Sequence, residues 1–213
     1  MDRDHTAGDV VAASVTWDDY MTRYAHDFYE WKDGAVIKMA PIHLAHDELS
    51  QYLSMLLRTY LSLRPVGMVR LAPFVMKLPN VNSSREPDLQ VILNTNMDAF
   101  TPTGMLNAAD IAIEIVSPES IKRDYEEKYA EYEQGGVTEY WLIDPIKQGA
   151  HIYRAREKGA YAGQPLVNGV YETNLLPGFK LDTALLWRDP LPDPLAIVKA
   201  VTDMLANPDN TTA

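Results

Sequence analysis

Two acidic residues, Asp88 and Glu114, stand in short apolar runs that are rich in isoleucine and valine. Runs of about 4–8 such residues, bounded by turn signals, are typical of β-strands. A carboxylate buried in a strand without a partner is costly, so it needs a cation, a hydrogen-bond network or a metal ion. The polar helix that follows, expected over residues 121–134, supplies Asp124 and Lys128. A metal-centred site is therefore the leading hypothesis.

The chemistry that this set could perform is metal-assisted cleavage of a phosphodiester bond. A hard divalent cation, usually Mg²⁺, is held by carboxylates, activates water and neutralises the phosphate. Asp88 begins one predicted strand and Glu114 lies within the next, so the two could share one ion. Asp124 and Lys128 are four residues apart, which places them on one face of a helix. A lysine there could position the water or stabilise the developing charge.

Each of these residues also has a simpler structural explanation. Asp88 could shape the start of its strand, because it follows a proline and aspartate is common at turns. Lys128 could belong to an exposed ion pair with the acids around it on the helix. Glu114 is harder to explain in this way, because an acid within an apolar run is rarely buried without a partner. Taken alone, Asp88 and Lys128 are better explained by these structural roles.

Other polar and aromatic residues near the predicted site have similar alternatives. His46, early in the first long helix, either faces the site or satisfies the start of that helix. His43 and Glu48 are expected at the surface. Tyr140 and Trp141 alternate across a predicted strand, so one faces each side of the sheet and core packing explains both.

Hydrophobic periodicity predicts the elements that position these residues. Residues 44–63 have apolar positions on one helical face. Residues 28–39 predict a hairpin, because Asp33-Gly34 is a two-residue turn signal. The strand over 109–116 is nearly all apolar and is expected to be central and buried on both faces. The other expected elements are a helix over 16–24, strands over 69–78, 89–93 and 137–143, polar loops over 79–84 and 94–107, a helical turn over 183–187 and a helix over 195–205.

This order of elements predicts an α/β fold. A mixed β-sheet would be flanked by two helices in the order αβββαβ, with an N-terminal hairpin and a C-terminal β-rich extension. A single domain over residues 15–205 is expected, with its core at about 41–145 and the extension at about 150–186. Residues 1–14 are expected to form a flexible arm and residues 206–213 a flexible tail.

Composition excludes several classes of protein. Cysteine is absent, which removes disulfides, thiolate zinc sites and cysteine nucleophiles. No glycine-rich phosphate loop or Gly-x-Ser-x-Gly motif is present, and the five histidines lack paired zinc spacing. The polar N-terminus argues against a signal peptide, and no apolar run approaches the roughly 20 residues of a membrane span. A cytoplasmic protein that does not bind membranes is the expectation.

The net charge of −11 counts against strong, non-specific binding of DNA by a single copy of the chain. The β-rich segment 151–173 carries tyrosines and valines that could be buried in an interface. A homodimer is therefore expected, because two-fold pairing is the commonest assembly and would place two sites on one duplex.

A larger set of motifs occurs in a fixed order along the chain. It comprises Met39-Ala40-Pro41, His46, Glu86-Pro87-Asp88, Glu114-Ile115-Val116-Ser117-Pro118, Asp124, Lys128, Tyr132, Gly136-Val137 and Glu139-Tyr140-Trp141-Leu142-Ile143-Asp144-Pro145. This set resembles the PD-(D/E)XK nuclease superfamily, which has the restriction endonuclease-like fold, and more closely its Uma-type branch of restriction endonucleases. The resemblance covers about residues 17–186. One departure is Val116, which stands where the superfamily has its signature lysine.

The resemblance implies a role for each candidate residue. Asp88 and Glu114 would bind Mg²⁺ or Mn²⁺, with the backbone carbonyl of Ile115 as a further ligand. Lys128 would replace the signature lysine from the following helix and orient the attacking water. Asp124 would hold Lys128 or a metal-bound water, and His46 would be an auxiliary residue.

Two functional hypotheses follow from this reading. The first is a Mg²⁺-dependent endonuclease that hydrolyses phosphodiester bonds in DNA. The second is a catalytically degenerate relative that acts as a binding or interaction module, which Val116 and the acidic charge keep open. A divalent ion between Asp88 and Glu114, with the Lys128 ammonium close by, would favour the first.

Overall fold

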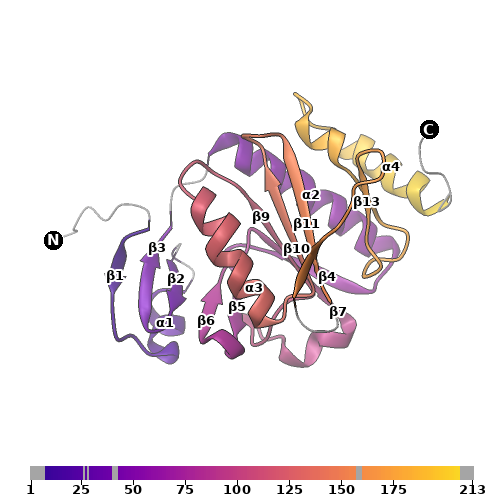
Figure 1. Ribbon diagram of the computed structural model, residues 1–213. Helices are drawn as coiled ribbons and strands as arrows, with labels where there is room; N and C mark the ends of the chain where they lie inside the picture. The colour runs from indigo at the N-terminus through magenta and orange to yellow at the C-terminus, as the bar shows by residue number, and fades with distance from the viewer. Residues whose placement is uncertain (1–7, 26, 28, 40–42, 157–159, 207–213) are drawn as a thin grey trace.

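The fold is organised around a six-stranded mixed β-sheet, seen in the computed structural model in Figure 1. The structure describes residues 8–25, 27, 29–39, 43–156 and 160–206. Adjacent strands run antiparallel except for the central parallel pair β9–β10. In spatial order the strands are β12 Tyr161–Gly163, β11 Gly149–Ala155, β10 Glu139–Asp144, β9 Ile111–Ile115, β7 Leu89–Leu93 and β4 Gly67–Leu71.

Helices cover both faces of this sheet (Figure 1). On one face lie α2 Leu44–Leu63 and α4 Pro194–Ala206, which share a core with the sheet. On the other face lies α3 Tyr129–Gly135, which continues directly from the π-helical segment η3 Arg123–Lys128. The mixed sheet between two helical layers confirms the predicted α/β architecture.

The alternation of side chains along the central strands explains the two cores. In β9, Ile113 faces the α2 side, whereas Ala112 faces the α3 side. In β10, Trp141 faces the α2 side and Tyr140 faces the α3 side, and both are fully buried. The prediction that these two aromatic residues pack on opposite faces is confirmed. Because side chains alternate in a strand, Glu114 points to the α3 side with Ala112.

A second six-stranded sheet carries the N-terminal hairpin. The hairpin turns at Asp33 and Gly34, which have positive φ angles of 47° and 83°, as the Asp-Gly turn signal predicts. The helix α1 Trp17–Arg23 begins at the N-cap Thr16, whose hydroxyl accepts a hydrogen bond from the amide of Asp19. In spatial order the strands are β1 Val10–Ala12, β3 Ala35–Lys38, β2 Tyr29–Lys32, β6 Ser83–Arg85, β5 Val75–Leu78 and β8 Gly104–Met105.

Several expectations from the sequence are corrected by this second sheet. The single strand over 69–78 is in fact β4 and β5, which belong to different sheets, because Pro73 between them cannot donate a ladder hydrogen bond. The expected polar loops contain short regular elements, namely η1 Pro79–Val81 and β6 in the first, and η2 Asn94–Ala99 and β8 in the second. Part of the expected flexible arm is the strand β1, which pairs with β3.

The C-terminal part of the chain is built from short strands and a helix. Strands β11 and β12 extend the main sheet, whereas β13 Val170–Glu172 and β14 Lys180–Asp182 form a two-stranded sheet of their own. The helical turn expected over 183–187 is the 3-10 segment η4 Thr183–Trp187. Some predictions fall on residues outside the described ranges: the Phe28 end of the hairpin, residues 40 and 41 of the Met39-Ala40-Pro41 motif, the first half of the expected arm and most of the expected tail. No helix in the described ranges is long and apolar enough to cross a membrane.

Candidate active site

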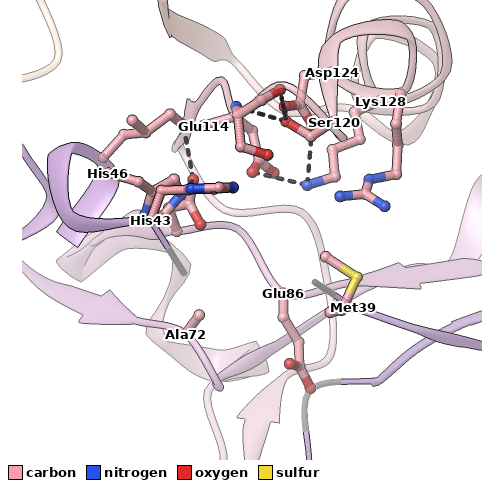
Figure 2. A pocket seen from close by; sticks show the side chains of 13 residues that line it. Met39, His43, His46, Ala72, Glu86, Glu114, Ser120, Asp124 and Lys128 are labelled. Atoms are coloured by element: carbon pink, nitrogen blue, oxygen red, sulfur yellow. Dashed lines mark hydrogen bonds and ion pairs between the residues drawn. The ribbon is translucent and has the colours of Figure 1, made fainter. Parts of the chain in front are cut away.

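The predicted site residues meet at one end of the main sheet, around a hollow of about 70 Å³ (Figure 2). Strands β7 and β9 are antiparallel, with Leu89 opposite Ile113, so the start of β7 lies beside the end of β9. This register brings Asp88, immediately before β7, next to Glu114 and Ile115. The helical segment η3 and the start of α2 contribute the other walls of the hollow.

Asp88 is held between a backbone amide and a histidine. Its Oδ2 atom accepts a hydrogen bond of 2.7 Å from the amide of Ile115 and lies 2.9 Å from Nε2 of His46. Burial tends to lower the pKa of His46, but the hydrogen bond to Asp88 and the nearby negative charges raise it above its ordinary value. His46 therefore faces the site, which was one of the two positions that the sequence allowed. Its raised pKa favours the charged imidazolium form beside Asp88.

Glu114 is a buried carboxylate with two partners, and its side chain is only 2% exposed. Its Oε2 atom lies 2.8 Å from Nζ of Lys128, and its Oε1 atom accepts a hydrogen bond from the hydroxyl of Tyr132. Burial raises the pKa of Glu114 above its ordinary value; Lys128 opposes this rise, and the charges of Asp88 and Asp124 add to it. A cation in the hollow would relieve this crowding of negative charge.

The side chain of Lys128 is buried and only 3% exposed. The simpler explanation, that Lys128 belongs to an exposed ion pair on the helix surface, is therefore wrong. Its Nζ atom lies 2.8 Å from Glu114, 3.4 Å from Asp124 and 3.6 Å from Glu30. Burial alone would lower the pKa of Lys128, but these three carboxylates raise it above its ordinary value. Lys128 is therefore a charged ammonium within a ring of three acids, of which Figure 2 shows Glu114 and Asp124 beside it.

Asp124 completes this ring from the same helical segment as Lys128. Its Oδ2 atom accepts a hydrogen bond from the hydroxyl of Ser120, whereas its buried Oδ1 atom has no hydrogen-bond partner among the described residues. Tyr140 anchors the backbone here, because its hydroxyl donates to the carbonyl of Asp124 at 2.9 Å. Burial raises the pKa of the Asp124 carboxyl.

A second layer of buried charges lies behind Lys128 and was not predicted. Arg85 of β6 donates to Glu30 of β2 and to both carboxylate oxygens of Glu131, at 2.8 and 2.9 Å. Burial tends to raise the pKa of Glu30, but Arg85 and Lys128 hold it at about 2. Lys32 also contacts Glu131, so a chain of alternating charges joins the second sheet to the site.

Two further residues, His43 and Glu86, line the same hollow but have partners outside the ring of acids around Lys128. His43 is exposed and lies 3.1 Å from Glu119, and Glu48 is exposed, so both surface predictions are confirmed. Glu86, from the same motif as Asp88, points away from the cluster (Figure 2) and accepts a hydrogen bond of 3.2 Å from the hydroxyl of Tyr20. Val116 is buried in the apolar core on the α3 side, so its position contributes no charge to the site.

The donor atoms in the hollow fit a hard divalent cation. Asp88, Glu114 and the carbonyl of Ile115 offer oxygen ligands, and Asp124, whose Oδ1 atom accepts no hydrogen bond from the described residues and lies 3.4 Å from Nζ of Lys128, lines the same hollow. No cluster of three or more His, Asp or Glu side chains able to enclose a metal occurs within the described parts of the chain. Mg²⁺ is usually bound by one or two carboxylates and keeps several of its waters.

Comparisons with known proteins point to one family. The family model described as "Uma2: Putative restriction endonuclease" matches residues 17–184. Among solved structures, the chain is similar to a protein from Anabaena variabilis described as a putative nuclease belonging to DUF820. That likeness has a TM-score of 0.67 and 17% sequence identity, and it covers 81% of this chain and 97% of the other. A search of curated proteins gives no match.

The two similarities support different statements. At 17% identity, the solved structure shows a shared fold and nothing further. The family match spans most of the chain, from the start of α1 through β14 and into η4, and so includes every candidate site residue. The chain therefore belongs to the Uma2 family and has the restriction endonuclease-like fold.

Proposed function

We propose that this protein hydrolyses phosphodiester bonds of DNA with the help of Mg²⁺ or Mn²⁺. The observation that carries the proposal is the buried pair of Glu114 and Lys128, 2.8 Å apart, beside Asp88 in one hollow. Burying a carboxylate and an ammonium is costly, and a purely structural pair is often no more stabilising than apolar packing. Perturbed acids and bases gathered in a pocket are the usual mark of a reactive site.

Each residue has a defined part in this reaction. Asp88 and Glu114, with the carbonyl of Ile115, would hold the cation. When bound, the cation supplies charge neutralisation at the phosphate and a more acidic water. Lys128, as a fixed ammonium, would donate hydrogen bonds to the attacking water oxygen and to the developing negative charge on the phosphate. In this step the water would lose a proton to solvent and its oxygen would bond to phosphorus, while the bond to the leaving sugar oxygen breaks and that oxygen takes up a proton from solvent.

The other residues of the ring would support Lys128 and Asp88. Asp124, fixed by Ser120, holds the ammonium of Lys128 from its own helical segment. His46 fixes the carboxylate of Asp88 from the start of α2. A homodimer, which would present two such sites to one duplex, is part of the proposal.

A second candidate function, that of a binding module that does not cleave, is favoured by one observation. Both carboxylate oxygens of Glu114 already have partners, Tyr132 and Lys128, so a cation has to share them. In that case the acids and Lys128 would form a structural remnant. A measurement of metal binding separates the nuclease from the binding module only in part. A measurement of DNA cleavage separates them fully.

We expect Mg²⁺ to raise the melting temperature of the wild-type protein, because a ligand that binds only the folded state stabilises it by about 2.7 kcal/mol at 100 times its dissociation constant. Asp88→Asn and Glu114→Gln should each lose most of this shift, since each removes a charged ligand. Glu48→Gln is the matched control, because Glu48 is exposed on α2. Thermal melts with and without Mg²⁺ measure the effect, and equal shifts in wild type and both site variants would place the ion elsewhere.

A further inference from the structure

Arg123 is a basic residue of the hollow that has no role in the reaction described above. It is half-buried and lines the hollow together with Asp124 and Lys128. Its Nε atom is buried and has no hydrogen-bond partner among the described residues. A buried polar group without a partner is costly, so an arginine kept in this state needs an explanation.

The π-helical geometry of η3 accounts for its position. In an α-helix, with 3.6 residues per turn, residues five apart lie about 140° apart around the axis, so Arg123 and Lys128 would point in different directions. The hydrogen bonds of a π-helix join residues five apart and stack them instead, and such segments are frequent at functional sites. Because η3 spans Arg123–Lys128, both cations line the same hollow.

Lys128 and Arg123 differ in whether their charged groups are already paired with carboxylates. The ammonium of Lys128 is surrounded by the carboxylates of Glu114, Asp124 and Glu30. Arg123 forms no ion pair within the described part of the chain, although its charge contributes to the low pKa of Glu30 and opposes the rise in the pKa of Asp124. A guanidinium binds a phosphate through two parallel hydrogen bonds, and among the described residues that line the hollow Arg123 is the only arginine.

We propose that Arg123 binds a phosphate group of the nucleic-acid backbone at the hollow, as a substrate-binding residue. The inference rests on the proposed function, because it takes the substrate to be a phosphodiester strand. A contact of this kind positions the strand without reading its sequence. It would place one phosphate beside Asp124 and Lys128, on the side of the hollow formed by η3.

The test compares Arg123→Ala and Arg123→Lys with the wild-type protein. Binding of labelled single-stranded and duplex oligonucleotides is measured by fluorescence anisotropy over a range of salt concentrations, in the presence of a chelator so that no cleavage occurs. Arg123→Ala should weaken binding by a factor on the order of 10 and reduce the slope of log K against log salt by about one. Arg123→Lys should keep the slope and regain only part of the affinity, because an ammonium lacks the planar fork.

Lys122→Ala is the matched control, because Lys122 is adjacent, exposed and carries the same charge. Its binding should stay close to that of the wild type, and melting curves confirm that every variant is folded. An unchanged affinity and slope in Arg123→Ala, or an equal loss in Lys122→Ala, would overturn the inference.

Cleavage in Mg²⁺, measured in parallel, separates this inference from the proposed function. If binding depends on Arg123 but no DNA is cleaved, the phosphate contact is supported and the proposed hydrolysis is rejected. If Arg123→Ala cleaves DNA with the wild-type kcat/KM, the proposed hydrolysis is supported and the phosphate contact is rejected. If the wild type binds no oligonucleotide in the chelator, a loss of kcat/KM in Arg123→Ala supports the contact, and absence of both binding and cleavage rejects both proposals.

Discussion

Replacing Lys128 by alanine should reduce Mg²⁺-dependent cleavage of DNA by a factor on the order of 10² or more, as the loss of one preorganised electrostatic group does. The ammonium lies 2.8 Å from Glu114 and is held by Asp124 and Glu30, so its direction is fixed before any substrate binds. Lys128→Arg should not restore the activity, because a planar guanidinium cannot replace a compact ammonium in this ring of acids. Nicking rates of supercoiled plasmid measure the effect.

The burial of Lys128 also determines how this experiment has to be controlled. Removing one partner of a buried ion pair leaves an uncompensated charge and costs about 3–5 kcal/mol, so Lys128→Ala is expected to melt at a lower temperature than the wild type. The assay therefore belongs well below the melting temperature of each variant. Lys122→Ala, an exposed lysine on the same helix, should be as active and as stable as the wild type. Full activity in folded Lys128→Ala would remove the lysine from the reaction.

Replacing Arg85 by methionine should destabilise the protein by about 3–5 kcal/mol at neutral pH, because it leaves the buried carboxylates of Glu30 and Glu131 without their main partner. Denaturant unfolding measures the loss. Lys32→Met is the matched control: Lys32 pairs with the same Glu131, but its side chain is 37% exposed. It should cost less than about 1 kcal/mol, as exposed ion pairs do. Equal losses in the two variants would show that Arg85 does not hold the network.

The same network predicts how this difference depends on pH. The pKa of Glu30 is held at about 2 in the folded protein, below its ordinary value of 4.5. A lowered carboxyl pKa contributes stability that is present above the unfolded value and is lost as the pH falls through the folded value. The gap in unfolding free energy between wild type and Arg85→Met should therefore be constant near neutral pH and shrink as the pH falls from about 4.5 towards 2. A gap that grows in acid would contradict this assignment.

The elements that carry local signals were predictable from the sequence. The helix α2 Leu44–Leu63 follows from apolar residues on one face, and the hairpin between β2 and β3 follows from Asp33-Gly34. Glu114 was predictable as a site residue, because an acid within an apolar run is rarely buried without a partner. Its side chain is indeed buried. These features depend on residues that are near one another in the chain.

The features that escaped prediction depend on residues far apart in the chain. Glu30 lies on β2, Arg85 on β6 and Glu131 on α3, and nothing in the local sequence of any of them indicates that the three side chains meet. Spacing alone also could not show that Lys128 is buried, since the same i,i+4 pattern with Asp124 is common on exposed helices. Nor did the apolar and polar pattern reveal the π-helical turn of η3 that brings Arg123 to the hollow.

Cleavage of supercoiled plasmid and of single-stranded DNA by the wild-type protein and by Glu114→Gln, with and without Mg²⁺, is the most direct test of the proposed hydrolysis. Glutamine keeps the shape of Glu114 and one acceptor oxygen, which can serve either Tyr132 or Lys128, while it removes the charged ligand. Because the variant also loses the buried ion pair, its cleavage is measured well below its own melting temperature. We expect cleavage by the wild type only when Mg²⁺ is present, and none by folded Glu114→Gln. Cleavage by Glu114→Gln at the wild-type rate, or none by the wild type on either DNA, would contradict it.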